Sequence, residues 1–520
     1  MRTCLLGGKR RNDANRKYRT TILLSSLVIL ASVAAMAGAS YALFGNTNDN
    51  VANVQVNVAT INVSTTPLIM QAFTNGTTSV NPSSDGTYHF KNGGTAKLEN
   101  GKIVFHNASA GDNLTVRVRV SNASPVKIQW KFSVDNTASN TNVVVYDDLT
   151  KLHNVTDRLY YAPADAVASG SSTQLSVYYV SIEANGNASG SVSFDVDAVF
   201  ANSIERKVSS LENWESAITA LQGMENQCYT LTDDITLGDS SLADQNAGKE
   251  LFFTPAEGKE TFVVINGNGH TITLEGDPAG EVGKGEGKTN SSGFGFHPRK
   301  SAMDGVNNEN NIHTIGKTRI VLRNVKIVNR KTTNNMANDS DDLSIYSGEH
   351  AYFDASVLDA TNTTFDGGLM MLGNAYFTNC TFQYSDGLGD PSHRYLCFAW
   401  GDLTGAANYT FYRSIFEGRM IDTDKKLAGM LYVHGDLGAA SHLNLLVANT
   451  FTGASNVSAP SNDVVIGQNT VLTTDKTNVF EDRSKIVNGV SCVDVTGASY
   501  NGETWTSANV MKNLETIYGA

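Results

Sequence analysis

Four polar residues within nine positions are the strongest candidates for chemistry in this sequence: Asp386, Asp390, His393 and Arg394. A carboxylate pair beside a histidine can transfer protons, and an added arginine suits the binding of a sugar acid. The same segment, SDGLGDPSHRY, also contains the ordinary turn residues Asp, Gly, Pro and Ser. We therefore favour a polar surface turn, with acid–base chemistry or sugar-acid binding as the alternative.

A second acidic group contains Asp339, Asp341 and Asp342. Calcium takes six to eight oxygen ligands, several of them from carboxylates, so this loop is a candidate Ca²⁺ site. Alternating Asp and Ser is equally typical of a solvated loop, which is the interpretation we favour. No other cofactor or metal is expected. The HExxH pattern of zinc peptidases is absent, and no two of the ten histidines are four residues apart.

Two aromatic residues beside the first group, Tyr395 and Trp400, are candidates for stacking against a sugar ring. In a strand, alternation would place Cys397 on one face and Trp400 on the other. The alternative is that some of these aromatic side chains face the core and the others cover a loop.

The cysteines fit neither a disulfide scaffold nor a metal cluster, since no CxxC pair occurs. Five are spread along the chain: Cys4, Cys228, Cys380, Cys397 and Cys492. We expect the last four to be buried small hydrophobes. Cys380 and Cys397 are 17 residues apart and are expected to form a stacked pair of core thiols, with a disulfide as the alternative.

The N-terminus predicts export. Residues 1–20 contain seven Lys or Arg and one Asp, and the stretch 21–44 has no charged residue. A basic region, an apolar region and small residues before the cut form a signal peptide, here with Ala42 as the residue preceding cleavage. An uncleaved anchor over residues 1–42 is the alternative. Either way we expect a secreted or cell-surface protein that meets the membrane only through this segment.

The charge balance limits the choice of partners. The net charge is −12 for the whole chain and −18 once the first 20 residues are set aside. Nucleic acid is excluded as the main partner, because binding phosphates needs clustered Lys and Arg. An anionic polysaccharide would be repelled as well, unless Ca²⁺ or a local basic patch mediated the contact.

The elements that must position these residues begin with a predicted antiparallel β-sandwich over residues 43–205. Alternating apolar and polar residues, separated by Asn, Gly and Ser clusters, indicate its strands. Six of them are predicted at 102–106, 114–121, 126–134, 142–146, 174–183 and 191–201.

A resemblance covers about residues 20–205. The segments ASYALFGN, NVQVNVATINV, SAGDNLTVRVRVSNASPVKIQWKFSV and SVSFDVDAVFANS, in this order, resemble the TasA/camelysin family. That resemblance implies an exported β-sandwich of the extracellular matrix, in which an N-terminal strand of one subunit can complete the sheet of the next. It also points to self-association or to other matrix and surface proteins as partners.

The segment that would be donated in this way is rich in valine. Val54, Val56, Val58, Ile61 and Val63 follow a strand pattern, with a bulge expected near residues 59–60. Their main chain could pair with the open sheet edge of a neighbouring copy. Ordinary pairing within the same chain is the alternative, and deleting residues 48–63 would distinguish the two.

A different organisation starts at residue 206. Apolar residues at steps of three and four predict an amphipathic helix over 206–222. After it, an apolar anchor follows Asn or Ser at intervals of 38, 17, 34 and 35 residues, which we interpret as multiples of a coil of 17–19 residues. The anchors are Ile327, Phe365, Phe382, Phe416 and Phe451.

Residues 208–495 resemble the pectate-lyase-like right-handed parallel β-helix proteins, through this repeat, the INGNGHTI motif and the helix that would cap the core. The predicted fold is all-β, with a β-helix over 206–500, loop insertions at 276–317 and 329–350, and a tail at 501–520. This fold hosts lyases, hydrolases, adhesins and inert stalks, so it does not decide the function.

We therefore expect an exported structural or adhesive protein of the cell surface or extracellular matrix, and lean toward no enzymatic activity. The alternatives are a polysaccharide lyase or hydrolase acting on acidic glycans, and a carbohydrate-binding adhesin without turnover.

Overall fold

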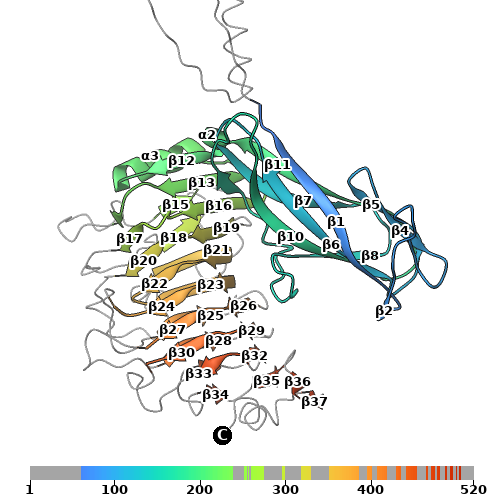
Figure 1. Cartoon of the computed structure of the whole chain (residues 1–520). Helices are drawn as coiled ribbons and strands as arrows, with labels where there is room; N and C mark the ends of the chain where they lie inside the picture. The colour runs from blue at the N-terminus through green and yellow to red at the C-terminus, as the bar shows by residue number, and fades with distance from the viewer. Residues whose placement is uncertain are drawn as a thin grey trace, which may run out of the picture. The chain divides into compact units, whose positions relative to one another are not determined.

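The computed structural model divides the chain into two compact units. Unit 1 contains Met1–Val143 and Ala162–Ser203, and unit 2 contains Val144–Tyr161 and Ile204–Ala520 (Figure 1). The structure describes residues 60–237, 251–253, 256, 259–274, 295–298, 318–329, 351–385, 395–400, 407–418, 429–434, 441–453, 464–466, 470–474, 477–480, 486–488, 492–495, 499–500 and 503–504.

Unit 1 contains two antiparallel sheets, as the sequence predicts. The first has the strand order β2-β1-β6-β10-β8 and the second β3-β4-β5-β11-β7-β9. Their strands are β1 (Val63–Thr74), β2 (Thr78–Ser79), β3 (Tyr88–His89), β4 (Thr95–Glu99), β5 (Lys102–Ala108), β6 (Asn113–Asn122), β7 (Ile128–Asn136), β8 (Thr141–Tyr146), β9 (Ala162–Ala164), β10 (Thr173–Ala184) and β11 (Ala188–Phe200).

The alternation in β6 shows how sequence pattern becomes a layered fold. Val116, Val118 and Val120 are fully buried, whereas Arg117 and Arg119, which alternate with them, lie on the other face of the sheet. The hydroxyl of Thr65, on the inward face of β1, donates to a carbonyl of β11 in the second sheet at 2.8 Å. The core of unit 1 therefore lies between the inward faces of the two sheets.

The Gly-Asp turn before β6 is built as a small polar core. Gly111 has φ +87°, which glycine adopts without strain. Asp112 is fully buried, and its carboxylate accepts from the hydroxyl of Thr74 at 2.6 Å and from the backbone N–H of Ser109 at 2.8 Å. These bonds attach the start of β6 to the end of β1.

Unit 2 is a parallel β-helix, which confirms the predicted fold class. Among the described residues its larger sheet has 16 strands, and all of their pairings are parallel. They are β12 (Glu205–Val208), β13 (Asn226–Leu231), β15 (Leu251–Phe253), β16 (Thr261–Asn266), β18 (Gly295–Pro298), β19 (Thr318–Arg323), β21 (Ala351–Thr361), β23 (Leu369–Thr378), β25 (Tyr395–Trp400), β26 (Asn408–Tyr412), β28 (Gly429–His434), β29 (Ser441–Leu446), β31 (Val464–Ile466), β32 (Thr470–Thr474), β34 (Ile486–Asn488) and β35 (Cys492–Val495).

The smaller sheet of unit 2 follows the same coils. Its eight strands are β14 (Ile235–Leu237), β17 (Thr271–Leu274), β20 (Lys326–Asn329), β22 (Thr364–Asp366), β24 (Thr381–Gln383), β27 (Ile415–Glu417), β30 (Thr450–Thr452) and β33 (Val479–Phe480). The short antiparallel hairpin of β36 (Ser499–Tyr500) and β37 (Glu503–Thr504) comes near the end of the chain.

The first coils are covered by the expected helix, which begins later than the predicted residue 206 because Glu205–Val208 form the strand β12. After the short helix α2 (Ala201–Ile204), α3 spans Leu211–Leu221, and the side chain of Ser210 caps it by accepting from the N–H of Asn213. Trp214 is fully buried and packs on Tyr229 of β13, with ring centroids 6.0 Å apart. The helix therefore closes the apolar core at its N-terminal end.

The predicted anchors occupy one position of successive coils. Phe365, Phe382, Phe416 and Phe451 are register partners on neighbouring strands of the smaller sheet, and the stacked ring centroids are 5.4, 4.7 and 4.4 Å apart. The expected coil length was wrong, because each of the four steps is a single coil. The 34- and 35-residue coils are longer because they also contain β25 or β28, strands that the repeat did not reveal.

Asparagine supplies the bend that precedes the smaller sheet. Asn324, Asn362 and Asn379 have φ values of 50°, 49° and 52°, in the left-handed region that Asn tolerates. Each of the last two donates its side-chain amide to the oxygen of the preceding asparagine, at 3.2 and 3.3 Å. Arg413 occupies the same turn position in the next coil and has a φ of 52°. The asparagines of the repeat therefore have a backbone role.

Candidate functional site

A buried polar cluster attaches the segment Val144–Tyr161 to the β-helix of unit 2. The guanidinium of Arg158 donates from Nε to Oδ2 of Asp359 at 2.6 Å and from Nη2 to Oδ1 at 2.9 Å. The two side chains are only 8% and 3% exposed. Burial alone would lower the pKa of Arg158, but the carboxylate of Asp359 more than offsets this effect and raises that pKa above its usual value.

His153 completes the cluster. Its Nδ1 lies 2.7 Å from Asp147, its Nε2 lies 2.8 Å from Nη1 of Arg158 and 3.1 Å from the hydroxyl of Thr378, and its ring stacks on Tyr412. Because arginine can only donate, Nε2 must accept and the imidazole hydrogen must be on Nδ1, facing Asp147. The ring thus lies between the carboxylate of Asp147 and the guanidinium of Arg158.

The arrangement of Asp147, His153 and Thr378 is that of a carboxylate, an imidazole and a hydroxyl in line. A catalytic base needs a free lone pair aimed at the nucleophile and access for the substrate. Here the Nε2 lone pair already accepts from Arg158, and His153 and Thr378 are 7% exposed. The cluster therefore acts as a structural lock that holds residues 147–158 on β21, β23 and β26.

A second buried carboxylate, Asp366 at the end of β22, is also saturated. Its oxygens accept from the amide of Gln383 at 2.9 Å and from the N–H and hydroxyl of Ser385 at 2.8 and 2.6 Å, and Lys326 lies 3.2 Å away. A carboxylate with these partners has little capacity left for a cation. Within the part of the chain that the structure describes, no group of three or more His, Cys, Asp or Glu could hold a metal ion.

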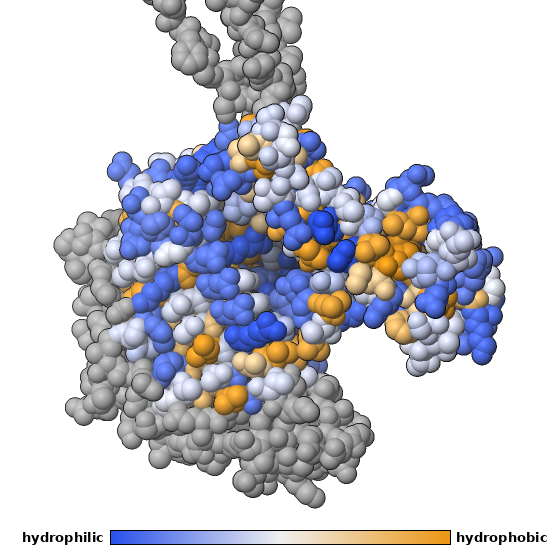
Figure 2. Space-filling view, in the orientation of Figure 1, coloured by the Kyte–Doolittle hydropathy of each residue, from blue (hydrophilic) through white to orange (hydrophobic). Residues whose placement is uncertain are grey.

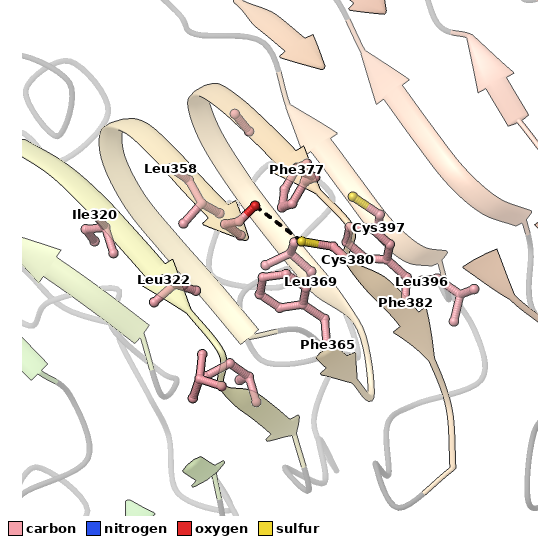
Figure 3. Packing of buried hydrophobic residues seen from close by; sticks show 14 of the residues in the cluster. Ile320, Leu322, Leu358, Phe365, Leu369, Phe377, Cys380, Phe382, Leu396 and Cys397 are labelled. Atoms are coloured by element: carbon pink, nitrogen blue, oxygen red, sulfur yellow. Dashed lines mark hydrogen bonds between the residues drawn. The ribbon is translucent and has the colours of Figure 1, made fainter. Parts of the chain in front are cut away.

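The two predicted core thiols are buried but do not stack as register partners. Cys397 of β25 pairs with Leu369 and Leu431, whereas Cys380 lies in the turn before β24 and donates to the carbonyl of Ala360 at 3.3 Å (Figure 3). Both are free thiols, so the disulfide alternative is wrong. Burial raises the pKa of Cys380 to about 12, which leaves an unreactive thiol.

Most of the residues that the sequence singled out for chemistry lie outside the described residues. These are Asp386, Asp390, His393 and Arg394, and the calcium candidates Asp339, Asp341 and Asp342. Tyr395 and Trp400 begin and end β25, where Trp400 pairs with Leu372 and His434 in register. Their roles remain predictions.

The described residues include only part of the N-terminal segment for which a signal peptide and a donated strand were predicted. Ala42, Val54, Val56 and Val58 lie outside them. Val63 begins β1 and pairs with Asn122 of β6, so at this residue pairing within the chain holds. No helix among the described residues is long and apolar enough to cross a membrane.

The lock is not visible in the sequence because its members are scattered along the chain. Asp147, His153 and Arg158 occur in YDDLTKLHNVTDRLY, which reads as a polar loop, and Asp359 follows 201 residues after Arg158. The one available signal was an unusual density of charged and aromatic residues in a loop between two strands of the sandwich.

Comparison with known proteins finds a similarity for part of unit 2. Residues 208–369 match the family described as "Putative pectate lyase-like adhesive domain". No curated protein matches the chain. One solved structure, the catalytic domain of a GH87 alpha-1,3-glucanase in complex with tetrasaccharides, is 12% identical over 86% of this chain and 80% of that chain, with a TM-score of 0.16. A TM-score of this size does not establish a shared fold.

The parallel sheets and the family match agree with each other. The match runs from the last residue of β12 to the first residue of β23 and therefore covers the capping helix and the first coils. Unit 2 is a parallel β-helix, and residues 208–369 of it are similar to the pectate lyase-like adhesive domains.

Proposed function

We propose that this chain is an exported cell-surface protein that adheres through its β-helix without a catalytic step. The observation that carries the proposal is the match of residues 208–369 to a pectate lyase-like adhesive domain. The absence of a catalytic step is supported by the two buried polar clusters, in which Nε2 of His153 and the carboxylate oxygens of Asp366 already have hydrogen-bond partners.

The architecture suits a projecting adhesive element. Each coil buries its apolar side chains against the next, as the stacked rings of Phe382 and Phe416 illustrate, so stiffness rises with the number of coils. Outward-facing side chains do not contribute to that core and are free to vary for binding. A stalk of this kind needs no reactive group.

Retention on a glycan array, with no change in the glycans, is the expected result for the full-length protein. Trp400→Ala should weaken the retention, whereas Ile415→Ala, which changes an exposed apolar side chain on the other sheet, should not. A Ca²⁺-dependent rise in unsaturated-uronate absorbance, abolished by Asp390→Ala and Arg394→Ala, would instead establish a lyase.

We propose in addition that the sandwich self-associates by strand donation, on account of one specific edge. β1 pairs with β6 along its length, but on its other side it pairs with β2 only at Phe73 and Thr74. Among the described residues, the edge from Val63 to Gln71 therefore has no strand partner. Pro67 lies in this stretch, as is typical of an edge strand.

The valine segment of another copy is the proposed occupant of that edge. Deleting residues 48–59 leaves β1 intact, so fibres seen by electron microscopy of the secreted protein should disappear while the far-UV spectrum keeps its β character. Replacing Leu149 by Ser, at an exposed site outside β1, is the matched control and should leave fibres unchanged. Fibres that survive the deletion would exclude strand donation.

A further inference from the structure

The outward face of the first sheet of unit 1 carries two arginines that have no acidic partner among the residues the structure describes. Arg117 and Arg119 alternate along β6, the middle of three long strands, and lie on the face opposite the core. Among the described residues, neither has a carboxylate within ion-pair distance. Some lysines of this unit differ in this respect, since Lys97 pairs with Asp85 at 3.4 Å and Lys131 with Asp197 at 3.7 Å.

The surroundings of the two arginines are almost free of negative charge. The five strands β1, β2, β6, β8 and β10 contain Arg117, Arg119 and Glu183 as their only charged residues. Glu183 pairs with Asn113, four residues from Arg117 along β6, which corresponds to about 13 Å. Within a chain of net charge −12, this sheet face is a local positive patch.

The neighbours in register supply apolar and aromatic contact. Leu68, Arg117 and Tyr179 lie side by side on β1, β6 and β10, and the next row contains Thr66, Arg119 and Val177. Leu68 is 45% exposed, and Met70 beyond it 42%, although both are large and apolar. Figure 2 shows hydrophobic residues grouped among hydrophilic ones over this sandwich.

Beyond Arg119, the outward face of this sheet carries hydroxyl and amide groups. The row beyond Arg119 contains Ser64, Ser121 and Gln174 from the same three strands. Such side chains can donate to and accept from hydroxyl groups. The face thus combines two guanidinium groups, one phenol ring, apolar side chains and small polar groups on a nearly flat surface.

We propose that this face, defined by Leu68, Met70, Arg117, Arg119 and Tyr179, binds a carboxylate-bearing polysaccharide. Alternate residues of a strand are about 7 Å apart, so the two guanidinium groups can each meet a separate carboxylate of an extended polymer. Arginine binds a planar carboxylate through two parallel hydrogen bonds. The Tyr179 ring and Leu68 offer apolar surface to the faces of the sugar rings.

A membrane surface fits this face less well. Recognition of anionic lipids uses clusters of four to eight Lys or Arg, and two are present here. The proposal is independent of adhesion by the β-helix, because all the residues involved belong to unit 1. It also requires no Ca²⁺, which the acidic chain would otherwise need to approach an anionic polymer.

The test measures binding of the full-length protein to oligogalacturonate in EDTA, with neutral dextran as the reference ligand. We expect binding to oligogalacturonate alone, weakening as salt is raised. The double variant Arg117→Gln/Arg119→Gln should bind at least tenfold more weakly. Tyr179→Ala should lose about threefold to tenfold, and Tyr179→Phe should retain most of the affinity.

Lys131→Gln is the matched control, because it removes one positive charge from the other sheet of the same sandwich, where Lys131 already pairs with Asp197. It should change the affinity by less than about twofold. The melting temperature of each variant shows that it has folded. Equal binding by the folded double variant, or equal binding of dextran by the native protein, would overturn the proposal. The proposal would also be overturned if the double variant still bound oligogalacturonate and differed from the native protein only in its state of self-association.

Discussion

Arg158 and Asp359 are 201 residues apart in sequence and form a buried ion pair with two parallel hydrogen bonds, at 2.6 and 2.9 Å. The pair lies in unit 2, which contains residues 144–161 together with the β-helix. Thr378 and His153 accept the remaining hydrogen bonds of the guanidinium. A loop that the sequence assigns to one domain thus contributes buried charge to the other unit.

Removing one charge of the Arg158–Asp359 pair should destabilise the protein strongly, whereas replacing both residues by apolar ones should not. Asp359→Asn leaves the guanidinium buried without its counter-charge, and we expect a loss of about 3–5 kcal/mol in the local stability of β21. Arg158→Met with Asp359→Leu removes both charges and should lose much less. Hydrogen exchange of β21 peptides, followed by mass spectrometry, measures both effects.

Lys259→Met provides the control for that measurement. Lys259 pairs with Glu225 in the same unit, but the two side chains are 63% and 47% exposed. Exposed pairs contribute about 0–1 kcal/mol, so exchange in β21 should hardly change. If Asp359→Asn had no greater effect than Lys259→Met, the lock would not hold the segment.

The column of stacked phenylalanines should dominate the stability of the later coils. Phe416 is fully buried between Phe382 and Phe451, and Phe416→Ala should cost about 3–5 kcal/mol. Its neighbour Ile415 is 45% exposed, and Ile415→Ala should change stability by about 0.5 kcal/mol or less. Urea unfolding of the two variants side by side gives the comparison, and similar midpoints would contradict it.

The asparagine turn predicts an unusual order of substitutions. Asn379 has φ 52°, and a left-handed conformation costs an ordinary residue about 1–2 kcal/mol. Asn379→Ala should therefore destabilise the coil more than Asn379→Gly, although glycine lacks the amide that bonds to Asn362. Thermal unfolding measures both, and a glycine variant less stable than the alanine variant would show that the side-chain ladder matters more than the backbone.

The regular elements could be predicted from sequence because their signals are local. The six predicted strands of the sandwich correspond to β5, β6, β7, β8, β10 and β11, with ends within about two residues except at the start of β11. The apolar steps that predicted the capping helix include Trp214 and Leu221, which are buried against the first coils. In each case, period and burial are properties of the same short segment.

The remaining features depend on contacts that no local pattern records. β1 was missed beyond Val63, because the polar residues of TTPLIM and the proline interrupt the expected alternation. The coil length was misjudged because insertions of variable size sit between register partners such as Phe382 and Phe416. The lock and the arginine face arise only when strands that are distant in sequence come together. The candidate catalytic and calcium-binding residues between Asp339 and Arg394 remain predictions.

The buried thiols give a prediction about alkaline solutions. Burial raises the pKa of Cys228 and of Cys380 to about 12, and that of Cys397 well above its usual value. Unfolding lets each thiol ionise near pH 9, so the unfolded chain releases protons that the folded chain retains. Stability contributed by these thiols is therefore present below about pH 9 and falls as the pH rises toward 12.

Labelling with iodoacetamide at pH 8 tests the same burial directly. In the folded protein, peptides containing Cys228, Cys380 and Cys397 should stay unlabelled, because the thiolate is the reactive form and neither ionisation nor access is available. In urea all three should react at the rate of a free cysteine peptide. Rapid labelling of Cys380 in the folded protein would mean that the core between β22, β23 and β24 opens far more easily than its stacked aromatic rings imply.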